Sequence, residues 1–162
     1  MRIGTQNWCG AGFYEYTNMT KLRKFLPIDL ERILEIEKVS FPARIAFSKS
    51  YFERLYREYS EEFVVAEFDK NVVGYVIGDA SGEIISIAVD PNYREKGIGQ
   101  SLANYLINHY KEKGIKELTI HVRTTNQAGV SFWENLGFKV KKTIKNYYLN
   151  GDDALLLRMN IK

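Results

Sequence analysis

Cysteine is almost absent from the sequence, since Cys9 is the only one in 162 residues. A single cysteine excludes an internal disulfide and any zinc site built from several cysteines, and it fits a reducing compartment. No segment approaches the roughly 18 consecutive apolar residues of a membrane-spanning helix, and the N-terminus lacks the apolar core of a signal peptide. The sequence therefore predicts a cytoplasmic protein without a metal site or a membrane partner.

An excess of charge of one sign is missing as well. The chain has 23 basic and 20 acidic residues, a formal net charge of +3, and no run of about five like charges that would indicate a binding tail. This balance gives no indication of a nucleic-acid partner. The hydrophobic content of 45% and the length fit one globular domain.

The first residues, "MRIGTQNWCGAGFYEYTN", show neither helical nor strand periodicity and contain three glycines. Regular patterning starts only at Met19. We therefore expect residues 1–18 to be an N-terminal extension or the product of an upstream start, with Met19 as a candidate native start. Residues 19–162 are expected to form a single domain.

Hydrophobic periodicity beyond Met19 predicts alternating helices and strands. Asp29 and Ser48 are expected to cap the first two helices, and Asn150-Gly151 predicts a tight hairpin between the last two strands. Short loops predict an antiparallel meander over residues 62–89. Helices are expected at 30–41, 49–60, 98–114 and 126–136, and strands at 20–27, 62–68, 72–80, 83–89, 115–122, 138–149 and 153–161.

The stretch "DPNYREKGIGQS", residues 90–101, lies between an apolar strand and a helix. Backbone N–H groups at a helix start bind anions, and Gly97 and Gly99 remove side chains where a phosphate must approach. Arg94 and Lys96 add positive charge, so a pyrophosphate is the expected ligand. The stretch lacks the Gly-Lys-Ser/Thr of a P-loop and the third glycine of a dinucleotide fingerprint. A glycine turn without a ligand stays open as the alternative.

The Arg-x-x-Gly-x-Gly of this turn resembles the pyrophosphate loop of the GNAT superfamily of acetyl-CoA-dependent N-acetyltransferases. The element order β-α-α-β-β-β-α-β-α-β-β is also similar to theirs, and "NQAGVSFWENLGF" resembles a second family signature. The resemblance covers roughly residues 21–161. It implies an α/β fold with a mixed, largely antiparallel central sheet, helices on both faces, and acetyl-CoA as cofactor.

Within the superfamily the chain most resembles the protein N-terminal (Nα) acetyltransferases, including the ribosomal-protein alanine N-acetyltransferases. The similar segments are "SFP" at 40–42, "HVRTTN" at 121–126 and "NYYLNGDDALLL" at 146–157. The resemblance implies acetyl transfer to the α-amino group of protein N-termini, with ribosomal or nascent chains as partners. Acetylation of a small amine, such as a polyamine or an antibiotic, stays open, as does a weakly catalytic CoA-binding module.

The resemblance also implies a role for individual residues. Phe41 and Pro42 would line the pocket of the first substrate residue, and Tyr147 and Tyr148 would lie over the peptide N-terminus. Three groups would hold the cofactor: strand residues Ile87, Ala88 and Val89, the loop residues Arg94, Glu95, Lys96, Gly97, Ile98, Gly99 and Gln100, and Asn126 with Trp133 on the following helix.

His121 stands where relatives carry the proposed general base, and Glu83 and Tyr148 are further catalytic candidates. An α-amine has a pKa of about 7.7–8.0, against about 10.4 for a lysine amine, so a modest base acting through water suffices for an N-terminus. A strand histidine satisfied by a neighbouring residue is the alternative for His121. Trp133 replaces the tyrosine that relatives use as proposed general acid, and an indole N–H does not release a proton usefully.

Overall fold

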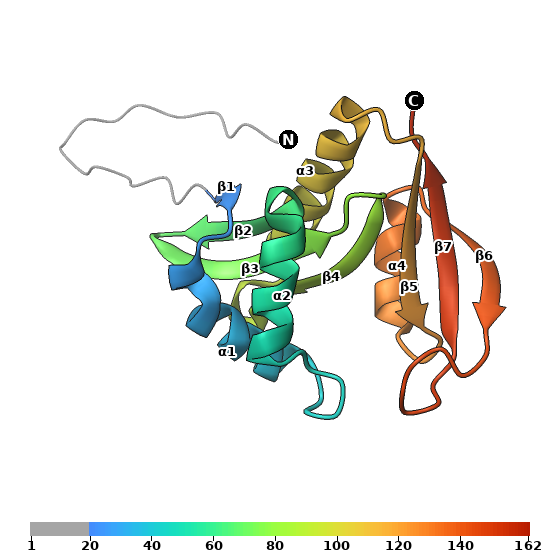
Figure 1. The fold of residues 1–162 in the computed structure, drawn as a ribbon, viewed down its shortest axis with the longest axis horizontal. Coiled ribbons are helices and arrows are strands. Elements are labelled where there is room, and N and C mark those ends of the chain that lie inside the picture. Colours follow the sequence, from blue (N-terminus) through green and yellow to red (C-terminus); the bar gives the residue numbers. More distant parts are fainter. Residues whose placement is uncertain (1–19) are drawn as a thin grey trace, which may run out of the picture.

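The computed structural model describes residues 20–162, so the expected extension over residues 1–18 and the candidate start at Met19 lie outside it. The described residues form a seven-stranded sheet of order β1-β2-β3-β4-β5-β7-β6 and four α-helices (Figure 1). The strands are β1 (Lys21–Lys24), β2 (Phe63–Phe68), β3 (Asn71–Gly78), β4 (Glu83–Val89), β5 (Glu117–Arg123), β6 (Lys139–Ile144) and β7 (Ala154–Asn160). The helices are α1 (Leu30–Ser40), α2 (Lys49–Tyr59), α3 (Ile98–Glu112) and α4 (Gln127–Asn135).

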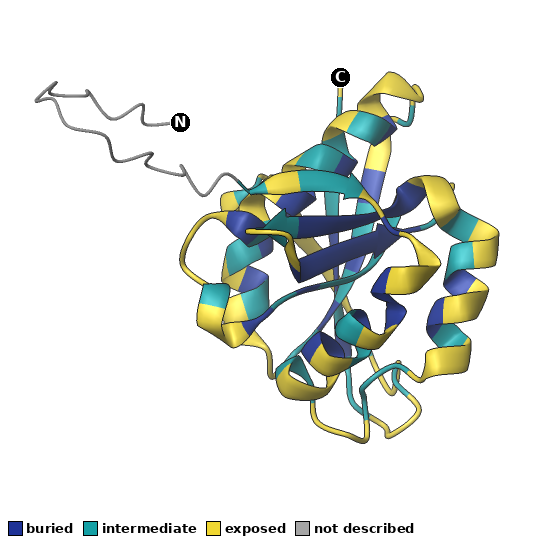
Figure 2. Cartoon of the chain, turned by 90° about the vertical axis from the view of Figure 1, so that its left-hand side faces the viewer, coloured by how far each residue is buried: buried dark blue, intermediate teal, exposed yellow. Residues whose placement is uncertain are grey.

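Helices cover both faces of this sheet, and each face has its own core. On one face α1 and α2 bury Ile33, Ile36 and Phe52 against β2 and β3. On the other face α3 and α4 pack Leu102 and Trp133 against the opposite side of the strands. Figure 2 shows the resulting layering, with buried central strands and helices exposed only on their outer surfaces. The expected α/β fold and element order are confirmed.

The sheet opens at its centre, between β4 and β5. All other strand pairs are antiparallel, but β4 and β5 are parallel and pair only at Glu83–Thr119 and Ile84–Ile120. Beyond these residues β5 turns away from β4 (Figure 1). The strand edge of β4 from Ile85 to Val89 therefore has no neighbouring strand on that side, and space opens through the sheet.

The predicted tight hairpin between the last two strands is wrong. β6 ends at Ile144, and the connection to β7 is a loop over residues 145–153 that contains Tyr147 and Tyr148. The Asp153 carboxylate accepts the Asn146 N–H (2.9 Å), and Asn146 takes a positive φ of 50°, which ends the ladder early. Asn150-Gly151 forms a turn within this loop, where the Gly151 N–H donates to the Tyr148 carbonyl (2.8 Å).

The predicted caps of the first two helices differ in outcome. Ser48 caps α2, since its hydroxyl accepts the Tyr51 N–H (3.3 Å). Asp29 does not cap α1, because its carboxylate accepts the Leu26 N–H (2.8 Å) and the Arg23 guanidinium (2.7 Å) instead. Burial alone would raise the pKa of Asp29, but the hydrogen bonds from Arg23 and Leu26 hold it below its usual value. Among residues 20–162 no helix is long and apolar enough to cross a membrane.

Candidate active site

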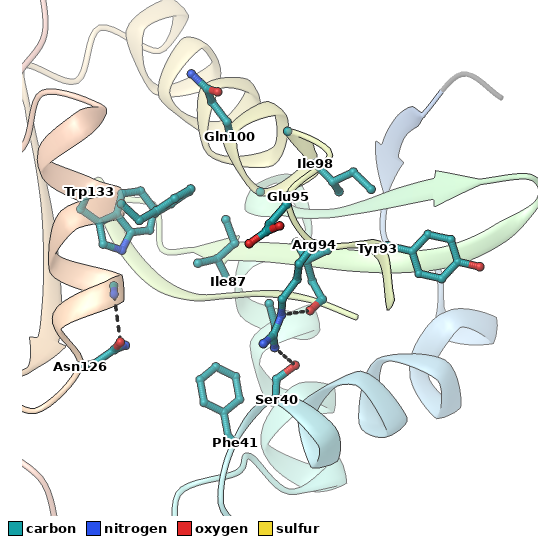
Figure 3. A pocket seen from close by; sticks show the side chains of 16 residues that line it. Ser40, Phe41, Ile87, Tyr93, Arg94, Glu95, Ile98, Gln100, Asn126 and Trp133 are labelled. Carbon is teal, nitrogen blue, oxygen red and sulfur yellow. Dashed lines mark hydrogen bonds between the residues drawn. The ribbon is translucent and has the colours of Figure 1, made fainter. Parts of the chain in front are cut away.

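Two cavities meet where β4 and β5 diverge. The first, of about 540 Å³, lies between the glycine turn and α4, and the second, of about 510 Å³, lies under the α1–α2 loop. Figure 3 shows the first cavity, with side chains from α1, β4, the glycine turn and α4. Both cavities are lined by Ile87, Asn126 and Trp133, so they adjoin at these residues.

The first cavity gathers nearly all of the residues predicted to bind the cofactor. The residues predicted for this role that line it are Ile87, Ala88, Val89, Arg94, Glu95, Gly97, Ile98, Gly99, Gln100, Asn126 and Trp133. Lys96 is absent from the lining, because its ammonium lies over the rings of Tyr93 (5.2 Å) and Phe68 (5.6 Å). Its backbone alone belongs to the turn that borders the cavity.

The start of α3 has backbone amides without helical partners. The first amide bonded within the helix is that of Ser101, which donates to the Gly97 carbonyl (2.9 Å), so the three amides before it have no partner in the helix. Gly97 has a φ of 76°, which favours glycine, and a Cβ there would meet nothing within 4 Å. The space on the Cβ side of Gly97, directly before the free amides, is therefore open.

Arg94 runs along the floor of the first cavity toward the end of α1. Its Nε donates to the Val89 carbonyl (3.0 Å), and its Nη2 donates to the Ser40 hydroxyl (3.3 Å), as Figure 3 shows. Asp90 follows Val89 in the chain, and its N–H donates to the Val73 carbonyl of β3 (2.8 Å). Alternate residues of a strand direct their backbone groups to opposite sides, so the groups of Ile87 and Val89 face the gap left by β5.

Asn126, the residue before α4, and Trp133 of α4 line both cavities. The side-chain oxygen Oδ1 of Asn126 caps the helix by accepting the Gly129 N–H (2.9 Å), and a Cβ at Gly129 would lie 2.5 Å from the Asn126 Nδ2. This cap fixes the Asn126 side chain at the cavity. Trp133 is 3% exposed and packs edge-on against Phe132 (4.9 Å) and Phe138 (5.2 Å).

His121 and Glu83, predicted as separate candidate bases, form one pair. The His121 Nδ1 lies 2.8 Å from the Glu83 Oε1, although the two residues come from different strands. Tyr147 stacks on the imidazole at 4.4 Å with an interplanar angle of 12°. His121 lines the second cavity and also a third, of about 380 Å³, which contains Glu83 and Tyr147. The contact with Glu83 therefore fits both alternatives for His121, a histidine satisfied by a neighbouring residue and a candidate general base.

Tyr148 closes the second cavity from the β6–β7 loop. Its hydroxyl donates to the His121 carbonyl (3.3 Å), and the Arg123 guanidinium lies 3.7 Å from its ring centroid. Burial raises the pKa of Tyr148 to about 12, outweighing the opposing charge of Arg123. The phenol is therefore neutral at physiological pH. Phe41 and Pro42 line the same cavity, as the sequence predicts.

Sequence reasoning missed several polar residues of the second cavity, among them Glu37 and Ser86. Glu37 is 2% exposed, and burial raises its pKa although hydrogen bonds from the Phe47 N–H and the Tyr75 hydroxyl oppose the shift. A signal was present, since Glu37 lies on the apolar stripe that Leu30 and Ile33 begin. Within residues 20–162 no cluster of histidine, cysteine, aspartate or glutamate could hold a metal ion.

Residues 30–138 match the sequence profile of the acetyltransferase (GNAT) family. An uncharacterized N-acetyltransferase of Methanocaldococcus jannaschii is 34% identical over 140 residues, 84% of this chain and 88% of that protein. The N-alpha-acetyltransferase of Sulfurisphaera tokodaii is 29% identical over 153 residues, 85% of this chain and 90% of that protein.

Solved structures share the fold. Ard1 from Thermoplasma volcanium superposes with a TM-score of 0.80 at 25% identity, over 88% of this chain and 98% of that chain. The NatC complex bound to Gag peptide and CoA superposes with a TM-score of 0.76 at 19% identity, over 88% of this chain and 99% of that chain.

Proposed function

The chain belongs to the GNAT family of acetyltransferases, and on this premise we propose that it transfers the acetyl group of acetyl-CoA to the α-amino group of protein N-termini. The observation that carries the proposal is the adjacency of two cavities, one at the free amides of α3 and one at His121. The name of the similar N-alpha-acetyltransferase and the CoA of the NatC structure support it.

The residues of the first cavity fit the donor. The unpaired amides of Ile98, Gly99 and Gln100 would hold the pyrophosphate, and the open edge of β4 at Ile87 would pair with the pantetheine arm. Asn126 keeps its amide N–H₂ for the same arm, because its oxygen is used by the helix cap. Acetyl-CoA supplies the acetyl group in activated form, as a thioester.

The His121–Glu83 pair fits the removal of the amine proton. An ionised carboxylate only accepts hydrogen bonds, so at the 2.8 Å contact the proton belongs to the His121 Nδ1. The Nε2 is then the basic nitrogen, which takes the proton of the amine through a water molecule. The amine forms its bond to the acetyl carbon as the carbon–sulfur bond breaks, and the leaving thiolate takes up a proton from solvent. The backbone N–H of Val89 is available to polarise the carbonyl.

An assay with three kinds of acceptor tests this function. Peptides with a free α-amine and an internal lysine should be acetylated faster than the same peptides with a formylated N-terminus, and faster than a polyamine. Faster turnover of the polyamine or of the formylated peptides would overturn the proposal. Tight CoA binding without turnover of any acceptor would favour the weakly catalytic CoA-binding module. That alternative arises because Trp133 cannot act as a general acid.

A further inference from the structure

A row of three polar side chains lies beneath the second cavity. Glu37 of α1 is 2% exposed and Tyr75 of β3 is fully buried, while Ser86 of β4 is partly exposed. Glu37 and Ser86 line the cavity. Its apolar wall residues include Phe41, Pro42, Ile45, Phe47, Ile85 and Ile87. Its other polar and charged wall residues are Ser40, Arg44, His121, Arg123, Thr125, Asn126, Tyr148 and Asp152.

The hydrogen bonds along this row have a fixed direction when Glu37 is ionised. The carboxylate accepts the Phe47 N–H (2.8 Å) and the Tyr75 hydroxyl. Burial and the neighbouring carboxylate raise the pKa of Tyr75 well above its usual value, so the phenol is neutral and has one proton to give. That proton goes to Glu37. In its contact with the Ser86 hydroxyl (3.2 Å) Tyr75 can therefore only accept, and Ser86 donates.

Ser86 is consequently left with an unused acceptor at the floor of the pocket. Tyr75 is its only side-chain hydrogen-bond partner among the described residues. When Glu37 is protonated, the direction of the hydrogen bonds along the row reverses. Glu37 then donates to Tyr75, Tyr75 donates to Ser86, and the Ser86 hydroxyl is free to donate into the pocket. A ligand hydroxyl both donates and accepts, so it pairs with Ser86 in either state. A methyl group forms no hydrogen bond with Ser86 in either protonation state of Glu37, and a buried polar group without a partner is destabilising.

We propose that the enzyme selects N-termini whose first residue carries a hydroxyl group, serine or threonine, and that Ser86 determines this specificity. The inference rests on the proposed function, because it assigns the second cavity to the first substrate residue. Valine has nearly the shape of threonine, and alanine nearly that of serine. Either would fill the apolar part of the pocket and form no hydrogen bond with Ser86, so discrimination arises from hydrogen bonding rather than from size.

Two peptide pairs that differ only in the first residue, threonine against valine and serine against alanine, test this proposal. In the unmodified protein kcat/KM should be about tenfold or more higher for the hydroxyl-bearing member of each pair. Ser86→Ala should bring both ratios close to one while the valine and alanine peptides keep their rates. Ser131→Ala, an exposed serine on α4, is the matched control and should leave the ratios unchanged.

The failures of this inference and of the proposed function are distinguishable. Equal or faster acetylation of the valine and alanine peptides by the unmodified protein overturns the selectivity and leaves the enzyme's activity intact. Unchanged ratios in Ser86→Ala overturn the role of Ser86. Ser86→Cys, which preserves the side-chain volume but bonds weakly, gives the same readout if Ser86→Ala does not fold. Absence of acetylation on every peptide contradicts the proposed function itself.

Discussion

The Nδ1 atom of His121 lies 2.8 Å from the Oε1 atom of Glu83, so the two candidate bases form one hydrogen-bonded pair. We predict that His121→Ala lowers kcat about 100-fold or more and leaves CoA affinity unchanged. Glu83→Ala should lower kcat less, because the imidazole loses only its orientation. In the double variant the two losses should not add, since Glu83 acts through His121. Steady-state kinetics with CoA titration measures all three, and additive losses would contradict the shared role.

The glycine that begins α3 has a matched counterpart at the end of the same helix. Gly97 and Gly114 both have a φ of 76°, and a Cβ at either would meet nothing within 4 Å. Alanine at either position should destabilise the fold by about 1–2 kcal/mol through the backbone alone. Only Gly97→Ala should also weaken CoA binding, because only Gly97 adjoins the free amides. Equal CoA affinity of the two variants in calorimetry would place the pyrophosphate elsewhere.

On the proposed function, Trp133 would lie where a proton donor could assist the leaving thiolate. Thiols ionise at a pKa of about 8.5, so the thiolate needs little assistance and we predict no gain from supplying an acid. Trp133→Tyr and Trp133→Phe remove similar volume from between Phe132 and Phe138. Their rates of acetyl transfer should therefore be similar in stopped-flow measurements. A rate about tenfold higher for Trp133→Tyr would show that the unmodified enzyme lacks an acid.

Asp90, at the entry to the glycine turn, should make folding stability depend on pH. Burial would raise the pKa of Asp90, but the hydrogen bonds from the Asn92 N–H and from Arg32 outweigh burial and lower it. A carboxyl with a lowered pKa stabilises the fold above its usual pKa of 3.8, and the stabilisation is lost as pH falls through the folded-state value.

We therefore expect Asp90→Asn to lower the free energy of unfolding by about 1 kcal/mol at pH 7, because the partly exposed Arg32 side chain limits the strength of the ion pair. The substitution keeps an oxygen for the Asn92 N–H (2.9 Å) and removes the charge. The difference between the two proteins should shrink toward pH 3. Denaturant unfolding at several pH values measures it, and a constant difference would mean that the charge is irrelevant.

Most of the fold could be predicted from the sequence because its signals are local. Apolar periodicity marks the helices and strands, and Gly114 and Gly137 take the positive φ values expected of residues that follow a helix. The β6–β7 loop could not be predicted, because Asn150-Gly151 favours a tight hairpin locally. The Asp153 carboxylate overrides this preference by binding Lys145 (2.7 Å) and the Asn146 N–H.

The site was predictable only where its residues belong to a recognisable segment. The glycine turn and the second signature led to the first cavity, but the contact between His121 and Glu83 depends on a parallel pairing of strands 38 residues apart. Glu37 and Ser86 belong to no such segment. Their role depends on Tyr75, which brings residues of α1 and β4 into one hydrogen-bonded row.

The central claim is that the acceptor is an α-amine at a protein N-terminus. The most direct measurement is tandem mass spectrometry of a peptide that begins with serine, contains one internal lysine, and has been incubated with the enzyme and acetyl-CoA. We predict that the acetyl group is found on the N-terminal nitrogen and that His121→Ala slows its appearance. Acetylation mainly on the lysine side chain would contradict the claim.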